Sequence, residues 1–331
     1  MKHLFFFYLT SLLTSYTAQD VISYPYNPDS DNDQVIAVSD ILSTVSVFGS
    51  DFVPSEIEIE GVPLSEVISQ LLASHLELQE TVVLQQEYIS QLQQFVSIND
   101  STILISGANL QVVSGAGSTS SGVNGTGNII VGYDEDNYFQ SANKSGSHNL
   151  VIGSGHTYSS FGGMVVGFGS EITGEYSSVS GGRENTAEGV YSSISGGFQN
   201  IASGEYSSVS GGYDNAASGY RACASGGQNN TASGSGSSVS GGYENVAVGD
   251  WSSVSGGENN NASGSRSSVL GGSNNNASET YSSVSGGQSN TASGSGSSVL
   301  GGNGNTAVGN VSSVSGGENN NASGSRSSVL G

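Results

Sequence analysis

A fifteen-residue repeat constrains this chain more than any other feature of its sequence. The repeat runs from Gly174 to the last residue, Gly331, with the pattern x-Ser-Ser-Val-Ser-Gly-Gly-x-x-Asn-x-Ala-Ser-Gly-x. We number its positions 1 to 15, so that Tyr176 occupies position 1. Asn occupies position 10 and Ala occupies position 12 in all ten complete repeats. A short, fixed period without insertions is typical of a stacked solenoid, whose turns are stable only against their neighbours.

The composition of the repeat favours strands over helices. Fifteen residues are too few for a helical repeat, and Gly at three positions disfavours a helix. The Ser-Ser-Val-Ser-Gly and Asn-x-Ala-Ser segments each predict a short parallel strand, with turns at the glycines between them. We therefore predict an all-β fold, a parallel β-roll or solenoid. Val at position 4 should face inward, and the Ser residues that flank it should face outward.

The predicted interior is thin, because Val and Ala are almost the only recurrent apolar residues. A single chain of this kind buries little apolar area per residue and is marginally stable on its own. We therefore expect several chains to pack together. The aromatic residues that occur at position 1, such as Tyr176 and Trp251, are either anchors of that interface or exposed contacts.

The Asn residues at position 10, from Asn185 to Asn320, allow two interpretations. In the first, they form an internal ladder in which each amide hydrogen-bonds its copy one turn away and closes the turn. In the second, they form a ligand-binding array. We favour the ladder, because a position that is invariant from turn to turn within one chain usually serves the backbone geometry.

The N-terminus predicts a secretory signal peptide over residues 1–18. It has a basic residue at Lys2, a short apolar run from Leu4 and the small residue Ala18 before a polar stretch. The apolar run is too short for a membrane helix, and we expect no other transmembrane helix in the chain. The expected location is therefore secreted or at the cell surface.

An Asp-rich segment after the signal peptide has the spacing of a calcium loop. Four carboxylates stand at loop positions 1, 3, 5 and 12, a backbone carbonyl stands at position 7, and Ca²⁺ prefers six to eight such oxygen ligands. The predicted ligands of one calcium ion are Asp29, Asp31, Asp33, Val35 and Asp40. The segment resembles the calcium loop of dockerin-type modules, but it has Gln34 where Gly is usual and has no second loop. The alternative is a solvated turn.

Heptad order follows between Leu64 and Val96. One core position holds Ile68, His75, Val82, Ile89 and Val96, and the other holds Leu64, Leu71, Leu78, Gln85 and Leu92. This order predicts a coiled-coil stalk, in which the two polar residues, His75 and Gln85, can set the register. A single amphipathic helix that packs on its own domain is the alternative.

These features predict five consecutive segments. They are a signal peptide (1–18), an acidic segment with the calcium loop (19–60), a coiled-coil stalk (61–98), the irregular first turns of the solenoid (99–174) and the regular fifteen-residue-repeat β-roll (175–331). Three apolar strands, which begin near Asn128, Asn149 and Gly163, should form the irregular turns, with residues 134–147 as an inserted loop.

The Val-Ser-Gly-Gly and Asn-x-Ala-Ser-Gly motifs resemble the heads of YadA-like trimeric autotransporter adhesins over residues 147–331. The resemblance implies a left-handed parallel β-roll, a homotrimer, display at a cell surface (the outer membrane if the source is bacterial) and adhesion to an extracellular macromolecule or surface glycan. Related repeats resemble phage tail-fibre proteins, so a phage-type fibre or a structural matrix protein is the alternative. The order of the segments departs from the family, because the coiled coil precedes the head.

Other classes of function fit less well. A net charge of −22 argues against binding to nucleic acid. A carbohydrate-active enzyme needs clustered carboxylates, whereas the acids of the repeat region are scattered, so we expect no catalytic residues and no organic cofactor. Ice binding favours regular Thr ladders, and Thr is sporadic here. Cys223 is expected to be a buried filler, and His148 and His156 are expected to be packing or hydrogen-bonding residues rather than metal ligands.

Overall fold

The computed structural model describes residues 58–137 and 141–331. The chain divides into two units, residues 1–110 and residues 111–331. Each unit is described by itself below.

The first unit contains one long helix between two small hairpins. Its elements are β1 (Glu58–Ile59), β2 (Val62–Pro63), α3 (Leu64–Gln93), β3 (Val96–Asn99) and β4 (Thr102–Ile105). Strands β1 and β2 pair antiparallel, and so do β3 and β4. The helix therefore covers most of the predicted heptads. The heptad assignment of Val96 is wrong, because this β-branched residue lies in β3 and pairs with Ile105.

The helix α3 buries none of its side chains. Its apolar residues are between 44% and 70% exposed: Ile68, Leu71, Leu72, Leu76, Leu78, Val82, Val83, Leu84, Tyr88, Ile89 and Leu92. The alternative in which α3 packs on its own domain therefore has no support in the described residues. The hairpin of β3 and β4 is equally open, with Ile98 72% and Ile103 69% exposed.

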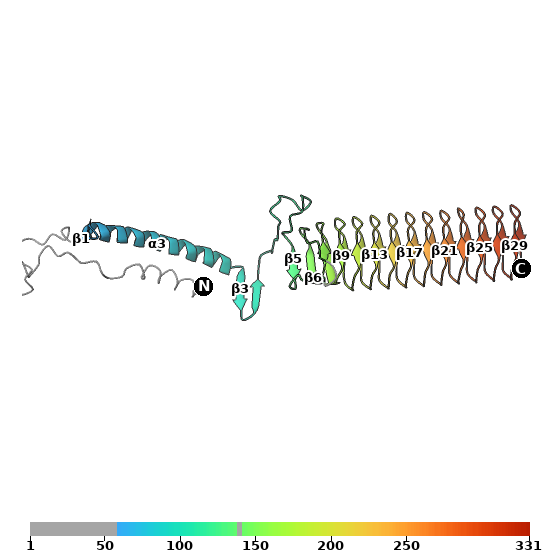
Figure 1. The fold of residues 1–331 in the computed structure, drawn as a ribbon, viewed down its shortest axis with the longest axis horizontal. Helices are drawn as coiled ribbons and strands as arrows, with labels where there is room; N and C mark the ends of the chain where they lie inside the picture. Colours follow the sequence, from blue (N-terminus) through green and yellow to red (C-terminus); the bar gives the residue numbers. More distant parts are fainter. Residues whose placement is uncertain (1–57, 138–140) are drawn as a thin grey trace, which may run out of the picture. The chain divides into compact units, whose positions relative to one another are not determined.

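The second unit is a parallel β-solenoid built from two sheets (Figure 1). The larger sheet has 14 strands: β5 (Ile129–Val131), β6 (Leu150–Ser154), β8 (Met164–Phe168), β10 (Ser178–Val179), β12 (Ser193–Ile194), β14 (Ser208–Val209), β16 (Cys223–Ala224), β18 (Ser238–Val239), β20 (Ser253–Val254), β22 (Ser268–Val269), β24 (Ser283–Val284), β26 (Ser298–Val299), β28 (Ser313–Val314) and β30 (Ser328–Val329).

The smaller sheet has 12 strands: β7 (Thr157–Tyr158), β9 (Glu171–Ile172), β11 (Thr186–Ala187), β13 (Ile201–Ala202), β15 (Ala216–Ala217), β17 (Thr231–Ala232), β19 (Val246–Ala247), β21 (Asn261–Ala262), β23 (Asn276–Ala277), β25 (Thr291–Ala292), β27 (Thr306–Ala307) and β29 (Asn321–Ala322). Each regular turn contributes one strand to each sheet, at positions 3–4 and 11–12. The prediction of an all-β parallel solenoid with two short strands per turn and one N-terminal helix is confirmed.

The first turns of the solenoid have their own lengths. Ile129 pairs with Leu150, Leu150 with Met164, and Met164 with Ser178, so the offsets are 21, 14 and 14 residues before the regular offset of 15 begins. The longest of these turns contains the predicted insertion at residues 134–147. The three irregular apolar strands were therefore correctly placed, but their 14-residue spacing was not recognised in the sequence.

The interior of the regular turns has one apolar column from each sheet. Val or Ile at position 4 and Ala at position 12 are almost fully buried, as in Val179, Ile194, Ala187 and Ala202, each 0% exposed. Ala224 replaces Val in one turn. Ser at position 2 is also buried, whereas Ser at positions 3 and 5, which flank position 4, is partly or fully exposed. The predicted inward Val and outward flanking Ser are thus confirmed.

Two kinds of turn geometry hold the stack together. Positions 1 and 9 adopt positive φ in every regular turn, even where the residue is bulky, as for Trp251 (φ 58) and Val311 (φ 56). The second residue of each Gly-Gly pair needs Gly for a different reason. A Cβ on Gly257 (φ +87) would lie 2.1 Å from the carbonyl oxygen of Gly272 in the next turn. The close approach of successive backbones thus explains this glycine.

The two glycines of one pair should differ sharply in their tolerance of a methyl group. We expect Gly257→Ala to lower the free energy of unfolding by roughly 3 kcal/mol, because it adds a backbone clash to an unfavourable φ. Gly256→Ala is the matched control, since a Cβ there meets nothing within 4 Å. Thermal unfolding followed by circular dichroism compares the two variants. Equal stability of both variants would contradict this account of the stacking.

Candidate functional site

The interior Asn column is a continuous hydrogen-bonded ladder. Buried Asn245 is typical: its N–H donates to Oδ1 of Asn230 (3.0 Å), and its own Oδ1 accepts from the N–H of Asn260 (3.0 Å). Its Nδ2 donates to the carbonyls of Gly241 and Gly257, both at 2.9 Å. Each side chain therefore closes its own turn and ties it to both neighbouring turns. The ladder interpretation is confirmed, and these amides are engaged internally.

Two other residues continue this ladder into the first turns. The N–H of Asn185 donates to Oγ of Ser170 (3.2 Å), and the N–H of Ser170 donates to Nδ1 of His156 (3.2 Å). The ring Nε2 of His156 lies 3.1 Å from the carbonyl oxygen of Ile152, so the neutral ring donates there. His156 is 1% exposed, and burial lowers its pKa. The expectation that His156 is a hydrogen-bonding residue is confirmed.

A cluster of charged and polar side chains closes the outside of the first turns. The buried Tyr158 donates its hydroxyl to Asp134 (2.8 Å), and burial together with that carboxylate raises the pKa of Tyr158. Lys144 pairs with Asp136 (2.9 Å) and Asp134 (3.5 Å). Although partial burial opposes its charge, the two carboxylates raise the pKa of Lys144, and the bond to Lys144 lowers that of Asp136. The cluster anchors the ends of the inserted loop, a structural role.

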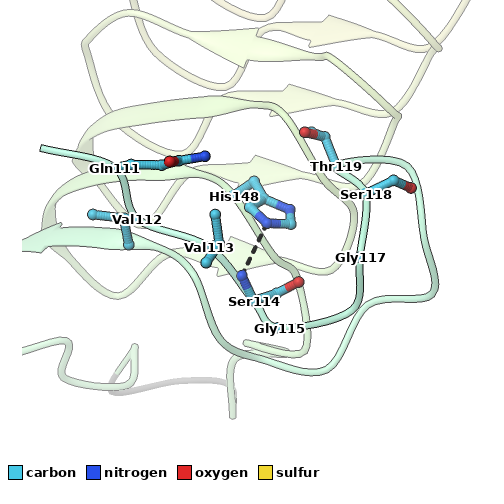
Figure 2. A pocket seen from close by; sticks show the side chains of 9 residues that line it. All are labelled: Gln111, Val112, Val113, Ser114, Gly115, Gly117, Ser118, Thr119 and His148. Atoms are coloured by element: carbon cyan, nitrogen blue, oxygen red, sulfur yellow. Dashed lines mark hydrogen bonds between the residues drawn. The ribbon is translucent and has the colours of Figure 1, made fainter. Parts of the chain in front are cut away.

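A cavity of about 510 Å³ lies beside His148 (Figure 2). Its lining residues are Gln111, Val112, Val113, Ser114, Gly115, Gly117, Ser118, Thr119 and His148. The N–H of Ser114 donates to Nε2 of His148 (3.0 Å), which places the proton of the neutral ring on Nδ1. That Nδ1 is buried and has no hydrogen-bond partner. Like His156, His148 therefore serves as a hydrogen-bonding residue.

The outer surface carries a column of large side chains at position 1, which we call the position-1 ridge (Tyr176 to Arg326). The rings of Tyr176, Tyr191 and Tyr206 stack with centroids 5.1 and 5.2 Å apart, and Phe161 meets Tyr176 edge-on. These tyrosines are 38% to 48% exposed. Stacking along the axis leaves their ring edges and hydroxyls on the surface.

Arginine side chains add positive charge to the aromatic columns. Arg183, at position 8, lies between the rings of Phe168 (5.6 Å) and Phe198 (5.3 Å). On the position-1 ridge, Arg221 lies over Tyr220 (4.8 Å), and Arg266 lies over Tyr281 (5.4 Å). These cation–π contacts hold the side chains along the surface. The sequence showed that positions 1 and 8 vary, but their stacking required the register of the turns.

The other predicted sites have different outcomes. The calcium loop of Asp29, Asp31, Asp33, Val35 and Asp40 lies outside the described residues, as does the predicted signal peptide. Within residues 58–137 and 141–331, no group of three or more His, Cys, Asp or Glu side chains could hold a metal ion. The expectation for Cys223 is wrong, because it occupies an outward-facing position 3 and is only partly buried, with Sγ 3.7 Å from Oγ of Ser225.

No helix in the described part of the chain combines the length and the hydropathy needed to cross a bilayer. No protein-family model and no curated protein matches this chain. The arrangement of the described residues is therefore the basis for a function. It consists of a uniform hydrogen-bonded interior and an outer surface that offers aromatic rings, hydroxyls and charges in regular rows.

The Asn ladder predicts that two buried polar positions differ greatly in their effect on stability. Asn245→Ala should lower the free energy of unfolding by roughly 3 kcal/mol, because it leaves buried backbone groups without partners. Ser237→Ala is the matched control and should change it by less than about 0.5 kcal/mol. The buried hydroxyl of Ser237 has no partner, and Ala222 fills the same position one turn earlier. Thermal unfolding of both variants tests this, and an inverse order would contradict it.

His156 should make the first turns sensitive to acid. Because its folded pKa lies below the unfolded value of about 6.5, its contribution to stability is complete above that pH. It is lost as the pH falls through the folded pKa, by at most about 1.4 kcal/mol per pH unit. Hydrogen exchange at Ser170 and Asn185 between about pH 7.5 and 5 measures the loss. His156→Asn, which supplies the residue used by the rest of the ladder, should remove this dependence. An unchanged acid response in that variant would assign the effect to other groups.

Proposed function

We propose that this protein is a secreted or surface-displayed trimeric fibre that acts in adhesion, as its resemblance to YadA-like heads implies. The observation that carries the proposal is the separation between a constant interior and a variable exterior. Val, Ala, Asn and Ser fill the buried positions of almost every turn, whereas positions 1, 8, 9 and 15 vary among aromatic, charged and polar residues. A solenoid of this kind presents a surface, and weak contacts repeated along it gain strength through avidity.

The trimeric state is supported by the apolar surface of the first unit. The side chains of α3 are exposed on a helix of 30 residues, which in isolation would be only marginally stable in water. The two-stranded hairpin of β3 and β4 is also too small to be stable alone. Packing of these elements against two further copies of the chain would bury the apolar side chains of both. We also propose the Asp-rich loop as a calcium site and a passive, non-catalytic role for the solenoid.

A phage-type fibre or a structural matrix protein is the second candidate. The same rod architecture would serve these roles, and the duplication that relates residues 239–272 to residues 299–331 supports a length-adjustable structural element. Adhesion and a purely structural role differ in one measurable respect, because only the first requires that the purified protein bind a surface.

A shortened rod tests the adhesive proposal. Deletion of residues 252–311 removes 60 residues and preserves the fifteen-residue register. We expect a folded, shorter rod whose adhesion to immobilised extracellular matrix or to cells falls in graded proportion, since fewer contacts are repeated. Surface plasmon resonance against those surfaces measures it. All-or-none loss of binding would point to a discrete site, and no binding by the full chain would favour the structural role.

The trimer can be tested with two substitutions of nearly equal exposure. Leu78, at a heptad core position, is 58% exposed, and Leu84, outside the core positions, is 56% exposed. We expect Leu78→Gln to weaken association of the trimer by roughly tenfold or more, and Leu84→Gln to leave it nearly unchanged. Sedimentation at micromolar concentration distinguishes them. A monomeric wild-type chain would overturn the trimer, and equal effects of both variants would overturn the heptad assignment.

A further inference from the structure

Trp251 is the single tryptophan of the chain and the most exposed aromatic residue on the position-1 ridge. Its side chain is 59% exposed, whereas the stacked tyrosines of the ridge are 38% to 48% exposed. It also adopts φ 58, a conformation that bulky residues rarely adopt. Both features are unfavourable for folding, so a role outside the packing of the solenoid would account for this residue.

The indole is supported on one side and open on the other. A Cβ on Gly236, one turn earlier, would lie 2.6 Å from Cε3 and 2.7 Å from Cζ3 of the ring, so the indole lies directly on that glycine. The next ridge residue, Arg266, turns away and stacks on Tyr281, to whose hydroxyl its Nη1 donates. Among the described residues, no ring or cation stacks on Trp251. One face of the indole is thus available to a ligand.

The duplication in the chain provides an internal comparison 60 residues further on. The backbone of the second copy is held by equivalent bonds, since N–H of Trp251 donates to the Ser235 carbonyl at 2.8 Å and N–H of Val311 donates to that of Ser295 at 2.8 Å. Gly296 takes the place of Gly236 under this residue. The fold therefore accepts Val at this position, and stacking of the turns does not require the indole.

The neighbouring residue differs between the two copies as well. Asp250, which precedes Trp251, accepts the N–H of Ser235 through Oδ1 at 3.0 Å, and Asn310 accepts that of Ser295 at 3.3 Å. Either side chain serves the turn, but only Asp250 adds a carboxylate. Asp250 is exposed, and a carboxylate has further lone pairs beyond the one that this bond uses. The first copy thus combines an open aromatic face with an adjacent strong acceptor.

This combination suits a sugar ring. The C–H face of a pyranose packs on the electron-rich face of an indole, and a carboxylate accepts charge-assisted hydrogen bonds from sugar hydroxyls. The negative charge of Asp250 disfavours an acidic sugar at the same place. We propose that Trp251 and Asp250, on the Gly236 platform, form a binding subsite for a neutral saccharide chain. The proposal narrows the ligand class of the proposed adhesive function, and it rests on that function only for its biological use.

The single tryptophan makes the subsite directly observable. The purified full-length protein is titrated to millimolar concentration with neutral β-linked hexasaccharides of glucose, galactose and mannose, with a hyaluronan hexasaccharide as the acidic counterpart. We expect a saturable change in tryptophan fluorescence with at least one neutral probe and a weaker change with hyaluronan. No change with any neutral probe overturns the proposal, and so does tighter binding of hyaluronan.

The second copy supplies natural control substitutions. Trp251→Val and Asp250→Asn, which copy Val311 and Asn310, should each weaken binding by about tenfold, measured by calorimetry, with unchanged thermal stability. The double variant Asn310→Asp, Val311→Trp should add a second site per chain. If Trp251→Val instead changes the oligomeric state in sedimentation, the indole is an interface anchor and the proposal is overturned.

The outcome can be separated from that of the adhesive proposal. Deletion of residues 252–311 leaves Gly236, Asp250 and Trp251 in place, so saccharide binding per chain should persist while adhesion of the rod falls. Adhesion that is retained by Trp251→Val, together with no saccharide binding by the wild type, would refute the subsite and leave the adhesive fibre standing. Saccharide binding without adhesion would do the reverse.

Discussion

The close, in-register contact between successive backbones is the constraint on which the rest of the solenoid depends. Each turn satisfies its backbone groups through the turn above and the turn below, so no turn is complete without its neighbours. The second glycine of each pair permits this approach, because any Cβ there would strike the next carbonyl, and the amide of each position-10 Asn ties the turn to both neighbours. Hydrogen bonding, rather than apolar area, thus specifies the register of a structure whose core consists of little more than one Val and one Ala per turn.

This arrangement separates stability from surface chemistry. The groups that hold the stack lie inside or in the backbone, so the side chains at positions 1 and 8 can change without disturbing it. The internal duplication illustrates the point, because Trp251 and Val311 occupy equivalent turns with the same backbone hydrogen bond of 2.8 Å. Variation of this kind allows one turn to acquire a binding residue while its copy remains plain, which is the basis for assigning a saccharide subsite to Trp251.

The first turns show how the ladder adapts when the repeat is imperfect. Ser170 and His156 replace Asn, and a buried imidazole accepts the backbone N–H that an amide oxygen accepts elsewhere. The substitution makes this end of the solenoid responsive to pH, whereas the amides of the regular turns do not titrate. The cluster of Tyr158, Asp134 and Lys144 fastens the longest turn at the same end.

The sequence by itself determined the parallel solenoid, its two strands per turn, the inward Val and Ala and the Asn ladder, because a strict period repeats one local solution to packing and hydrogen bonding. It also located the long helix, although Val96 proved to lie in β3, where pairing with Ile105 outweighed the heptad pattern. Only the tertiary structure decided what depends on register between turns. The 14-residue offsets align His156 with the Asn column, and stacking converts isolated letters at position 1 into a ridge of rings. Residues far apart in the sequence become neighbours there, so no local pattern could reveal that Trp251 rests on Gly236.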